Sequence, residues 1–137
     1  MKRVLVIMLA AFVLCACADN TQKEKKLLND ILKVHDKVMA KDEVLMKNKS
    51  HLDSLLKLPA KDTAEKVNMR ALDLKLVAAE EAMETWMGKF QPEMTGKSHD
   101  EVMQYYSEQK KQVMAIDSQV NVAITESGKY LSNHHIK

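Results

Sequence analysis

The sequence contains little of what tight turns, sheets and disulfide frameworks require. Of its 137 residues, only 3 are Gly, 2 are Pro and 2 are Cys, and 4% are aromatic. Three glycines are too few for a glycine-rich phosphate loop together with the turns of a β-sandwich or a doubly wound sheet. No sign of charge dominates either, because the formal net charge is +2. A nucleic-acid-binding surface is therefore not expected.

The residues that are abundant favour helices. Hydrophobic residues make up 46% of the chain and charged residues 29%, an apolar content too high for a disordered protein. Ala, Glu, Lys, Leu and Met are frequent, and all of them have high helix propensity. At this length we expect one domain, and its fold class is expected to be all-α.

The sequence also lacks the recurrent motifs of catalysis. There is no G-x-S-x-G, no H-E-x-x-H, no phosphate-binding P-loop and no C-x-x-C-H. A di-iron bundle would need Glu-x-x-His pairs, and no Glu or Asp here has a His three residues later. We therefore expect a protein that is not an enzyme and that holds no catalytic cofactor.

The N-terminus has the organisation of an export signal. Lys2 and Arg3 precede an apolar run of eleven residues, 4–14. As a helix this run would span about 17 Å, which is too short for a hydrocarbon core of about 30 Å. It suits the apolar segment of a signal peptide. The residues that follow, LCAC at 14–17, resemble the lipobox of bacterial lipoproteins, in which the cysteine becomes the lipidated N-terminus.

Cys17 is the expected lipidation site, because Cys15 would place the bulky Leu14 directly before the cleavage point. The predicted division is a lipoprotein signal peptide over 1–16, then a lipidated N-terminus and short tether over 17–22. The alternative is an ordinary cleaved signal whose cysteines are incidental. Ala18 follows the cysteine, with Asp19 one place later. This order favours the outer membrane of a diderm bacterium, facing the periplasm, and surface exposure is the alternative.

Three long segments carry apolar residues at helical spacing, 23–58, 62–90 and 98–128. Pro59 and Pro92 end the first two, and capping boxes at 62–65 and 98–101 begin the second and third. Gly128 is a plausible C-cap, with a tail over 132–137. Since each helix has one apolar stripe, the sequence predicts an antiparallel up-down-up three-helix bundle over 23–131. A dimer that completes a larger bundle or coiled coil is the alternative. The oligomeric state is left open.

Two short segments contain residues that could bind a metal or haem. Residues 35–39 read HDKVM and residues 99–103 read HDEVM, so His35 and Met39, like His99 and Met103, lie four apart on one helix face. Imidazole and thioether both suit copper, and both serve as axial ligands of haem iron. The alternative is that His35 pairs with a carboxylate at the bundle edge and that His99 lies on the surface of a first turn.

Three further residues are candidates for protein contact. Tyr105 and Tyr106 are adjacent, so they cannot both face inward along one helix, and one of them is expected to be exposed. Met87 flanks the apolar stripe of its helix, as do Met39 and Met46. Methionines of this kind fill cores or form adaptable binding surfaces. We expect core filling for most of them, with Met87 as a candidate contact residue.

The chain resembles a group of small bacterial lipoproteins labelled "viral A-type inclusion protein", a label that carries no activity. The resemblance rests on the lipobox at Cys17, HDKVM at 35–39, AMETWMGKF at 82–90 and SHDEVM at 98–103. It implies a small helical cell-envelope lipoprotein. The sequence thus predicts a membrane-anchored, non-enzymatic structural or protein-interaction module. Its partners would be the membrane, through the lipid, and another envelope protein. The alternative is a small copper- or haem-binding carrier.

Overall fold

The computed structural model describes the backbone of residues 2–59 and 62–134, and side chains from residue 19 onward within these ranges. Its four helices are α1 (Lys2–Met39), α2 (Asp42–Leu56), α3 (Thr63–Lys89) and α4 (His99–Asn133). No strand occurs in these ranges. The all-α fold class expected from the composition is confirmed.

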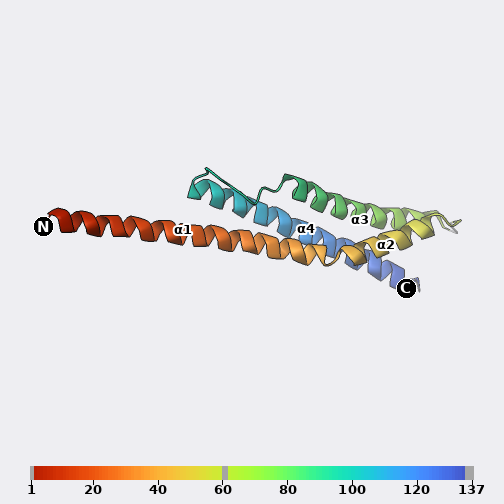
Figure 1. Cartoon of the computed structure of the whole chain (residues 1–137). Coiled ribbons are helices and arrows are strands. Elements are labelled where there is room, and N and C mark those ends of the chain that lie inside the picture. The colour runs from red at the N-terminus through yellow and green to blue at the C-terminus, as the bar shows by residue number, and fades with distance from the viewer. Residues whose placement is uncertain (1, 60–61, 135–137) are drawn as a thin grey trace.

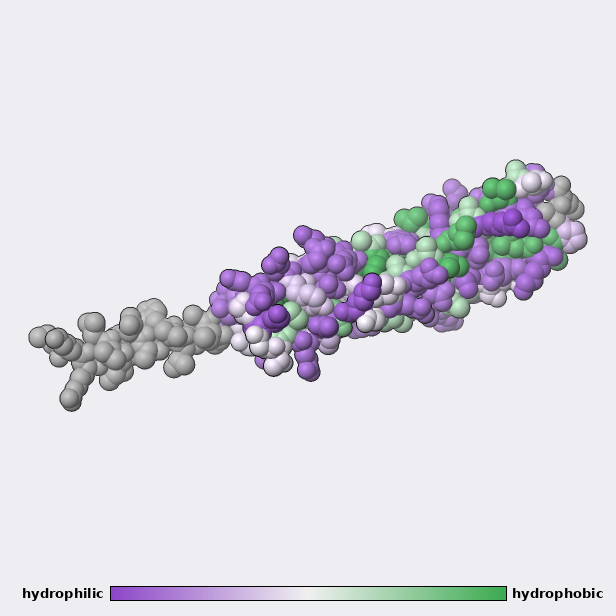
Figure 2. Space-filling model, turned by 90° about the horizontal axis from the view of Figure 1, so that it is seen from above, coloured by the Kyte–Doolittle hydropathy of each residue, from purple (hydrophilic) through white to green (hydrophobic). Residues whose placement is uncertain are grey.

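The helices form an elongated bundle in which α4 is the central element. Helix α4 packs against α1, α2 and α3, and α2 also packs against α3. In Figure 1, α1 and α2 follow one another along the bundle, and α3 and α4 lie alongside them. Figure 2 shows apolar side chains interspersed with polar ones on the face seen from above. The molecule is therefore a narrow helical bundle with a large surface for its size.

The apolar stripes read from the sequence form one continuous core. Ile31, Leu52, Leu76 and Val113 are completely buried, and each buried aliphatic side chain of this size contributes about 1.5–3 kcal/mol. The other buried apolar residues extend this core along the bundle. They are Val38, Leu45, Met69, Leu72, Ala79, Met83, Trp86, Val102, Tyr106, Ile116, Val120, Ala123 and Leu131.

The prediction of a single helix over 23–58 is wrong, because the helix is interrupted after Met39 and resumes as α2 at Asp42. The Lys41 N–H bonds to the Val38 carbonyl at 2.9 Å, which closes α1 with a tight turn, and the Leu45 N–H bonds to the Lys41 carbonyl at 3.0 Å. Between Val38 and Leu45 the stripe lacks an apolar residue, since Lys41 and Asp42 stand where one would be needed. Two acidic residues then occupy the first turn of α2, where the helix dipole favours negative charge.

The other helix ends agree with the sequence except at the C-terminus. The Asp62 side chain accepts from the Ala64 N–H at 2.9 Å, but the capping box predicted at 62–65 does not form, because Glu65 contacts Tyr130 and His134 instead. Ser98 forms a complete capping box with Glu101. Gly128, however, is not a C-cap, because α4 continues through it to Asn133. A side chain at Gly128 would meet the Asn48 amide nitrogen at 3.6 Å. That is an ordinary van der Waals distance to Asn48, a buried amide of the facing helix, so Gly128 is simply an interior residue of α4.

The structure tests only part of the predictions made for the N-terminus. Residues 19–22, the described part of the expected tether, are already helical within α1. An ion pair between Asp19 and Lys23, one turn apart at 2.5 Å, supports this beginning of the helix. The side chain of Cys17 lies outside the described residues. Over the part that the structure describes, no helix combines the length and apolar content needed to cross a membrane.

Candidate functional site: a methionine-lined groove

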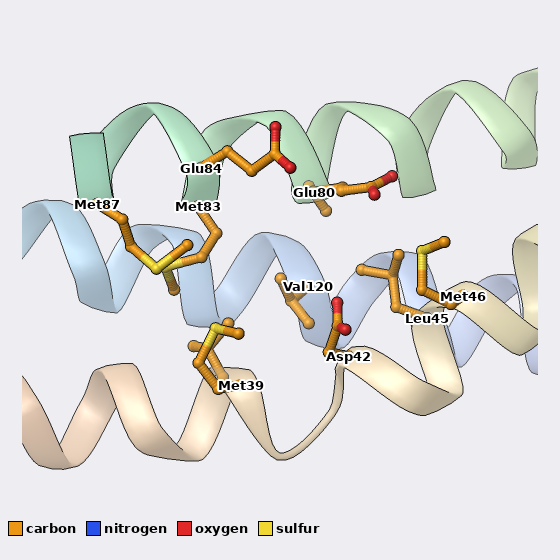
Figure 3. Close-up of a pocket in the computed structure, with 11 residues that line it drawn as sticks. Met39, Asp42, Leu45, Met46, Glu80, Met83, Glu84, Met87 and Val120 are labelled. Carbon is orange, nitrogen blue, oxygen red and sulfur yellow. The ribbon is translucent and has the colours of Figure 1, made fainter.

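A groove opens where α1 ends and α2 begins, facing α3. Its volume is about 240 Å³, and the break at Ala40–Lys41 separates the two helices that form one of its walls (Figure 3). Val120 of α4 lies behind it, as Figure 3 also shows. The lining residues are Val38, Met39, Asp42, Leu45, Met46, Ala79, Glu80, Met83, Glu84, Met87 and Val120. The helix break that the sequence did not predict therefore positions the groove.

Four of the eight apolar residues that line this groove are methionines. Met83 is buried, whereas Met39, Met46 and Met87 are 39%, 41% and 39% exposed. Three thioether side chains therefore stand at the groove mouth rather than in the core. Core filling, the expectation for most methionines, fails for these three. Flexible, polarisable methionines form surfaces that adapt to what they bind.

The groove mouth is acidic. Asp42, Glu80 and Glu84 line it, and Figure 3 shows Glu80 and Glu84 on α3 across from Asp42 at the start of α2. Glu80 has a long contact, at 4.0 Å, with Lys49. Within residues 19–59 and 62–134, Asp42 and Glu84 have no hydrogen-bond or ion-pair partner. The mouth thus attracts cationic groups.

His35 lies next to this groove and joins α1 to α3. Its Nε2 is 3.3 Å from the Sδ of Met87, and its Nδ1 is 3.0 Å from the Oδ1 of Asp36. The imidazole ring is tilted toward the buried indole of Trp86, with 6.1 Å between ring centres. The side chain of His35 remains 26% exposed. Sequence reasoning placed His35 and Met39 on one face but could not identify Met87 as their partner across the bundle.

The second predicted pair is separate from the first. His99 begins α4, and its Nδ1 is 2.7 Å from Oε1 of Glu24 on α1. Glu24 precedes His35 by eleven residues, or about 16 Å along a helix. Met103 is half-buried one turn further along α4. The structure therefore does not bring His35, Met39, His99 and Met103 into one site. Among the described residues, no three His, Cys, Asp or Glu side chains converge as a metal site.

Tyr105 and Tyr106 both support the loop between α3 and α4. Tyr106 is buried and donates from its hydroxyl to the Pro92 carbonyl at 2.8 Å, while the Tyr105 hydroxyl accepts from the Gln91 N–H at 2.8 Å. Tyr105 is half-buried and stacks on Phe90. The expectation that one of the two tyrosines is exposed is therefore wrong, because the loop covers the side that a bare helix would leave open.

Ion pairs tie α1 to α4 on either side of His35. Lys110 donates to Asp30 at 2.7 Å, and this hydrogen bond lowers the pKa of the Asp30 carboxyl. Asp117 accepts from Lys37 at 2.8 Å and from Lys41 at 2.5 Å. Burial raises the pKa of Asp117, but the two lysines outweigh it, and the pKa is lowered. These pairs hold α1 in place beside the groove.

Comparison with known proteins adds no assignment to this geometry. No protein-family model matches the chain, and neither a curated protein nor a solved structure matches it. The function therefore has to be argued from the residues themselves.

Proposed function

We propose that this protein is a lipid-anchored, non-enzymatic binding module of the cell envelope, with the methionine-lined groove as its contact surface. In this proposal an up-down-up three-helix bundle follows a cleaved lipoprotein signal peptide, with α1 and α2 together as its first helix. Cys17 carries the lipid. The protein resides at the outer membrane and faces the periplasm.

The N-terminal sequence supports the anchor. A basic start, an apolar run of eleven residues and the LCAC segment match what a lipoprotein signal requires. The resemblance to small envelope lipoproteins rests partly on the same residues. Two or three acyl chains on Cys17 would give stable membrane attachment, whereas one chain would not.

The position of the groove suits a protein held by its N-terminus. Helix α1 is continuous from Asp19 to Met39, a rise of about 30 Å. Since Asp19 lies two residues after the anchoring cysteine, the groove would stand about this far from the membrane surface if α1 is upright. A partner in the periplasm could reach it there.

One observation carries the interaction role: an apolar groove whose mouth bears carboxylates that lack partners within the described part of the chain. Asp42 and Glu84 would gain ion pairs from a cationic partner, and the methionines would bury its apolar side chains. We propose that the groove binds a basic amphipathic helix of another envelope protein, with Lys or Arg flanking the apolar face of that helix.

Crosslinking in cells tests this role. A photoactivatable residue replaces Met46 in the groove or, as the control, Leu74, which is 65% exposed on α3 and does not line the groove. We expect an adduct from position 46 that is absent from position 74. The crosslinked peptide should carry apolar and basic residues at helical spacing.

Charge-neutral variants test the recognition itself. Asp42→Asn with Glu84→Gln should remove most of the adduct, while Glu43→Gln with Glu81→Gln, which changes two exposed carboxylates outside the groove lining, should leave it. The proposal fails if both crosslinker positions give the same adducts. It also fails if neither gives one, or if the groove variant captures its partner as well as the wild type.

A second candidate function is supported by a different observation. His35 and Met87 bring an imidazole nitrogen and a thioether sulfur to 3.3 Å from one another. A soft thioether and an imidazole, both copper ligands, in contact at an exposed edge favour a metal carrier over a purely structural role for this corner of the groove.

A further inference from the structure

We infer that His35, Met39 and Met87 form a binding site for Cu(I) at the α1 end of the groove. The inference deepens the second candidate function, on which it rests, and does not depend on the interaction role. The site differs from the four-residue set suggested by the sequence, because α3 supplies Met87 and because His99 and Met103 lie elsewhere.

The three donors come from two helices and face the same space. His35 and Met39 are one turn apart on α1, so their side chains lie on one face. Figure 3 shows Met39 of α1 and Met87 of α3 directed toward one another, with Met83 beside them. The Nε2 of His35 is in contact with the Sδ of Met87. His35 and Met87 are thus in contact, and Met39 lines the same groove as Met87.

The distance between the two contacting atoms fits a shared metal ion. A metal bound to nitrogen at about 2.0 Å and to sulfur at about 2.3 Å, with a near-tetrahedral angle, holds the two ligand atoms about 3.5 Å apart. The His35 Nε2 and Met87 Sδ atoms are 3.3 Å apart. Little rearrangement would be needed for both to bind one ion.

Asp36 orients the imidazole for this role. Its carboxylate lies 3.0 Å from the His35 Nδ1, so a proton on Nδ1 is stabilised and the Nε2 lone pair is directed away from Asp36 toward Met87. A carboxylate on the second nitrogen is the usual partner of a metal-bound histidine. Without a cation, the lone pairs of Nε2 and Sδ would face each other.

The donor chemistry selects the ion. Thioether sulfur is a soft ligand that favours Cu(I), and imidazole also binds copper, whereas Zn²⁺ sites use thiolate, imidazole and carboxylate. The buried Trp86 ring lies beside His35, which shields one side of the site from water. The exposed side chains of Met39 and Met87 leave the other side open. Such a site can exchange its ion and suits a carrier.

The test is an anaerobic titration with Cu(I), in competition with a Cu(I) chelator, of the purified full-length chain in detergent. The chain carries Cys15→Ser and Cys17→Ser, so that no thiolate competes for the ion. We expect one equivalent to bind, and X-ray absorption should show both Cu–N and Cu–S ligands. His35→Ala and Met87→Leu should each lower the affinity at least tenfold, and Met39→Leu should also weaken it. Asp36→Asn should lower the Cu(I) affinity roughly tenfold, as changes to the hydrogen-bond partner of a metal-bound histidine do.

Matched controls separate ligation from packing. Met114→Leu changes a methionine that is 52% exposed and outside the groove lining, and His99→Ala changes the histidine paired with Glu24. Neither should alter the Cu(I) affinity, and circular dichroism should show that every variant stays folded. The inference is overturned if the protein does not compete with the chelator, or if His35→Ala and Met87→Leu bind as the wild type does. It is equally overturned if the controls lose affinity to the same extent.

The alternative for the same contact is a purely structural hydrogen bond, in which the Nε2–H of His35 donates to the Met87 sulfur. In that case Cu(I) does not displace the proton in competition with the chelator, and the titration gives the overturning result. Failure of the copper titration would leave the crosslinking result intact, because that experiment depends on Asp42 and Glu84. The two proposals can therefore fail separately.

Discussion

The Lys41 Nζ donates to Asp117 Oδ1 at 2.5 Å and to Asn121 Oδ1 at 2.7 Å, and so ties the break between α1 and α2 to α4. Lys37 bonds the second oxygen of the same carboxylate at 2.8 Å. The side chain of Asp117 is only 14% exposed. This one carboxylate therefore holds the wall of the groove where the helix is interrupted.

We predict that Asp117→Asn destabilises the fold by about 1–2 kcal/mol at neutral pH, because two charge-assisted contacts weaken and both Lys37 and Lys41 lose their counter-charge. Since the pKa of Asp117 is lowered from 3.8, its contribution is complete above that unfolded value and is lost as the pH falls through the folded value. Urea unfolding at several pH values measures this. The wild type and the variant should converge in acid, and a constant difference down to pH 2 would contradict the assignment. Asp30→Asn, which changes a more exposed pair, should cost less.

The pKa of Asp73 is shifted in the opposite direction from that of Asp117. One of its oxygens is buried without a hydrogen-bond partner in the described part of the chain. Burial first, and then the charge of Asp53, raises the pKa of Asp73, although Lys49 partly offsets this. A raised carboxyl pKa means that stability is lost as the pH rises. We predict that Asp73→Asn raises stability at pH 7, by up to about 1 kcal/mol.

The Asp73 prediction is checked by the same unfolding series. The gain should shrink below pH 3.8, the ordinary value for this carboxyl, because the wild-type side chain is then neutral in both states. A loss of stability at neutral pH would show that Asp73 has a stabilising role that its surroundings do not indicate.

Asn48 and Ser127 form a buried polar pair between α2 and α4. The Asn48 amide donates to the Ser127 hydroxyl at 2.9 Å, and that hydroxyl donates to the Ala123 carbonyl at 2.6 Å. We predict that Asn48→Ala lowers the free energy of unfolding by about 1–3 kcal/mol, because the hydrogen bond to Ser127 is lost and the smaller side chain leaves a cavity. A double-mutant cycle with Ser127→Ala should give a coupling of at least about 0.5 kcal/mol. Additive effects would mean that the pair does not fix how α2 lies on α4.

The two tyrosines should differ in their effect on the α3–α4 loop. Tyr106→Phe removes a hydrogen bond to the Pro92 carbonyl from a buried side chain and should cost about 1 kcal/mol. Tyr105→Phe leaves the exposed Gln91 N–H to water, so its cost should be smaller. Thermal unfolding of both variants tests the order. A larger loss for Tyr105→Phe would reverse the assignment of which tyrosine holds the loop.

The helices could be predicted because each one repeats a single local pattern. The stripe from Met69 to Trp86 and the capping residues Asp62 and Ser98 lie where the structure has them. The break at Lys41 was missed because the stripe resumes at Leu45 with a spacing of seven, as an unbroken helix would show. Gly128 was misread because a glycine inside a helix looks like a helix end in the sequence, whereas α4 continues through it to Asn133.

The candidate site could be predicted only in part. His35 and Met39 are neighbours on one helix, so their spacing revealed them. Met87 joins them only through the way α3 lies against α1, which depends on packing between helices and leaves no local signal. The same limit applies to His99, whose partner Glu24 lies 75 residues away in sequence. Patterns within one helix were readable, and pairings between helices were not.

The central claim, a lipid-anchored envelope module, is tested most directly by the intact mass of the protein isolated from membranes of the cells that produce it. We expect a chain that begins at Cys17 and carries a diacylglyceryl group and an acyl chain. Cys15→Ala should leave this modification unchanged apart from the discarded signal, whereas Cys17→Ala should abolish it and release the protein from membranes. An unlipidated chain that retains residues 1–16, or one that starts elsewhere and lacks lipid, would contradict the account.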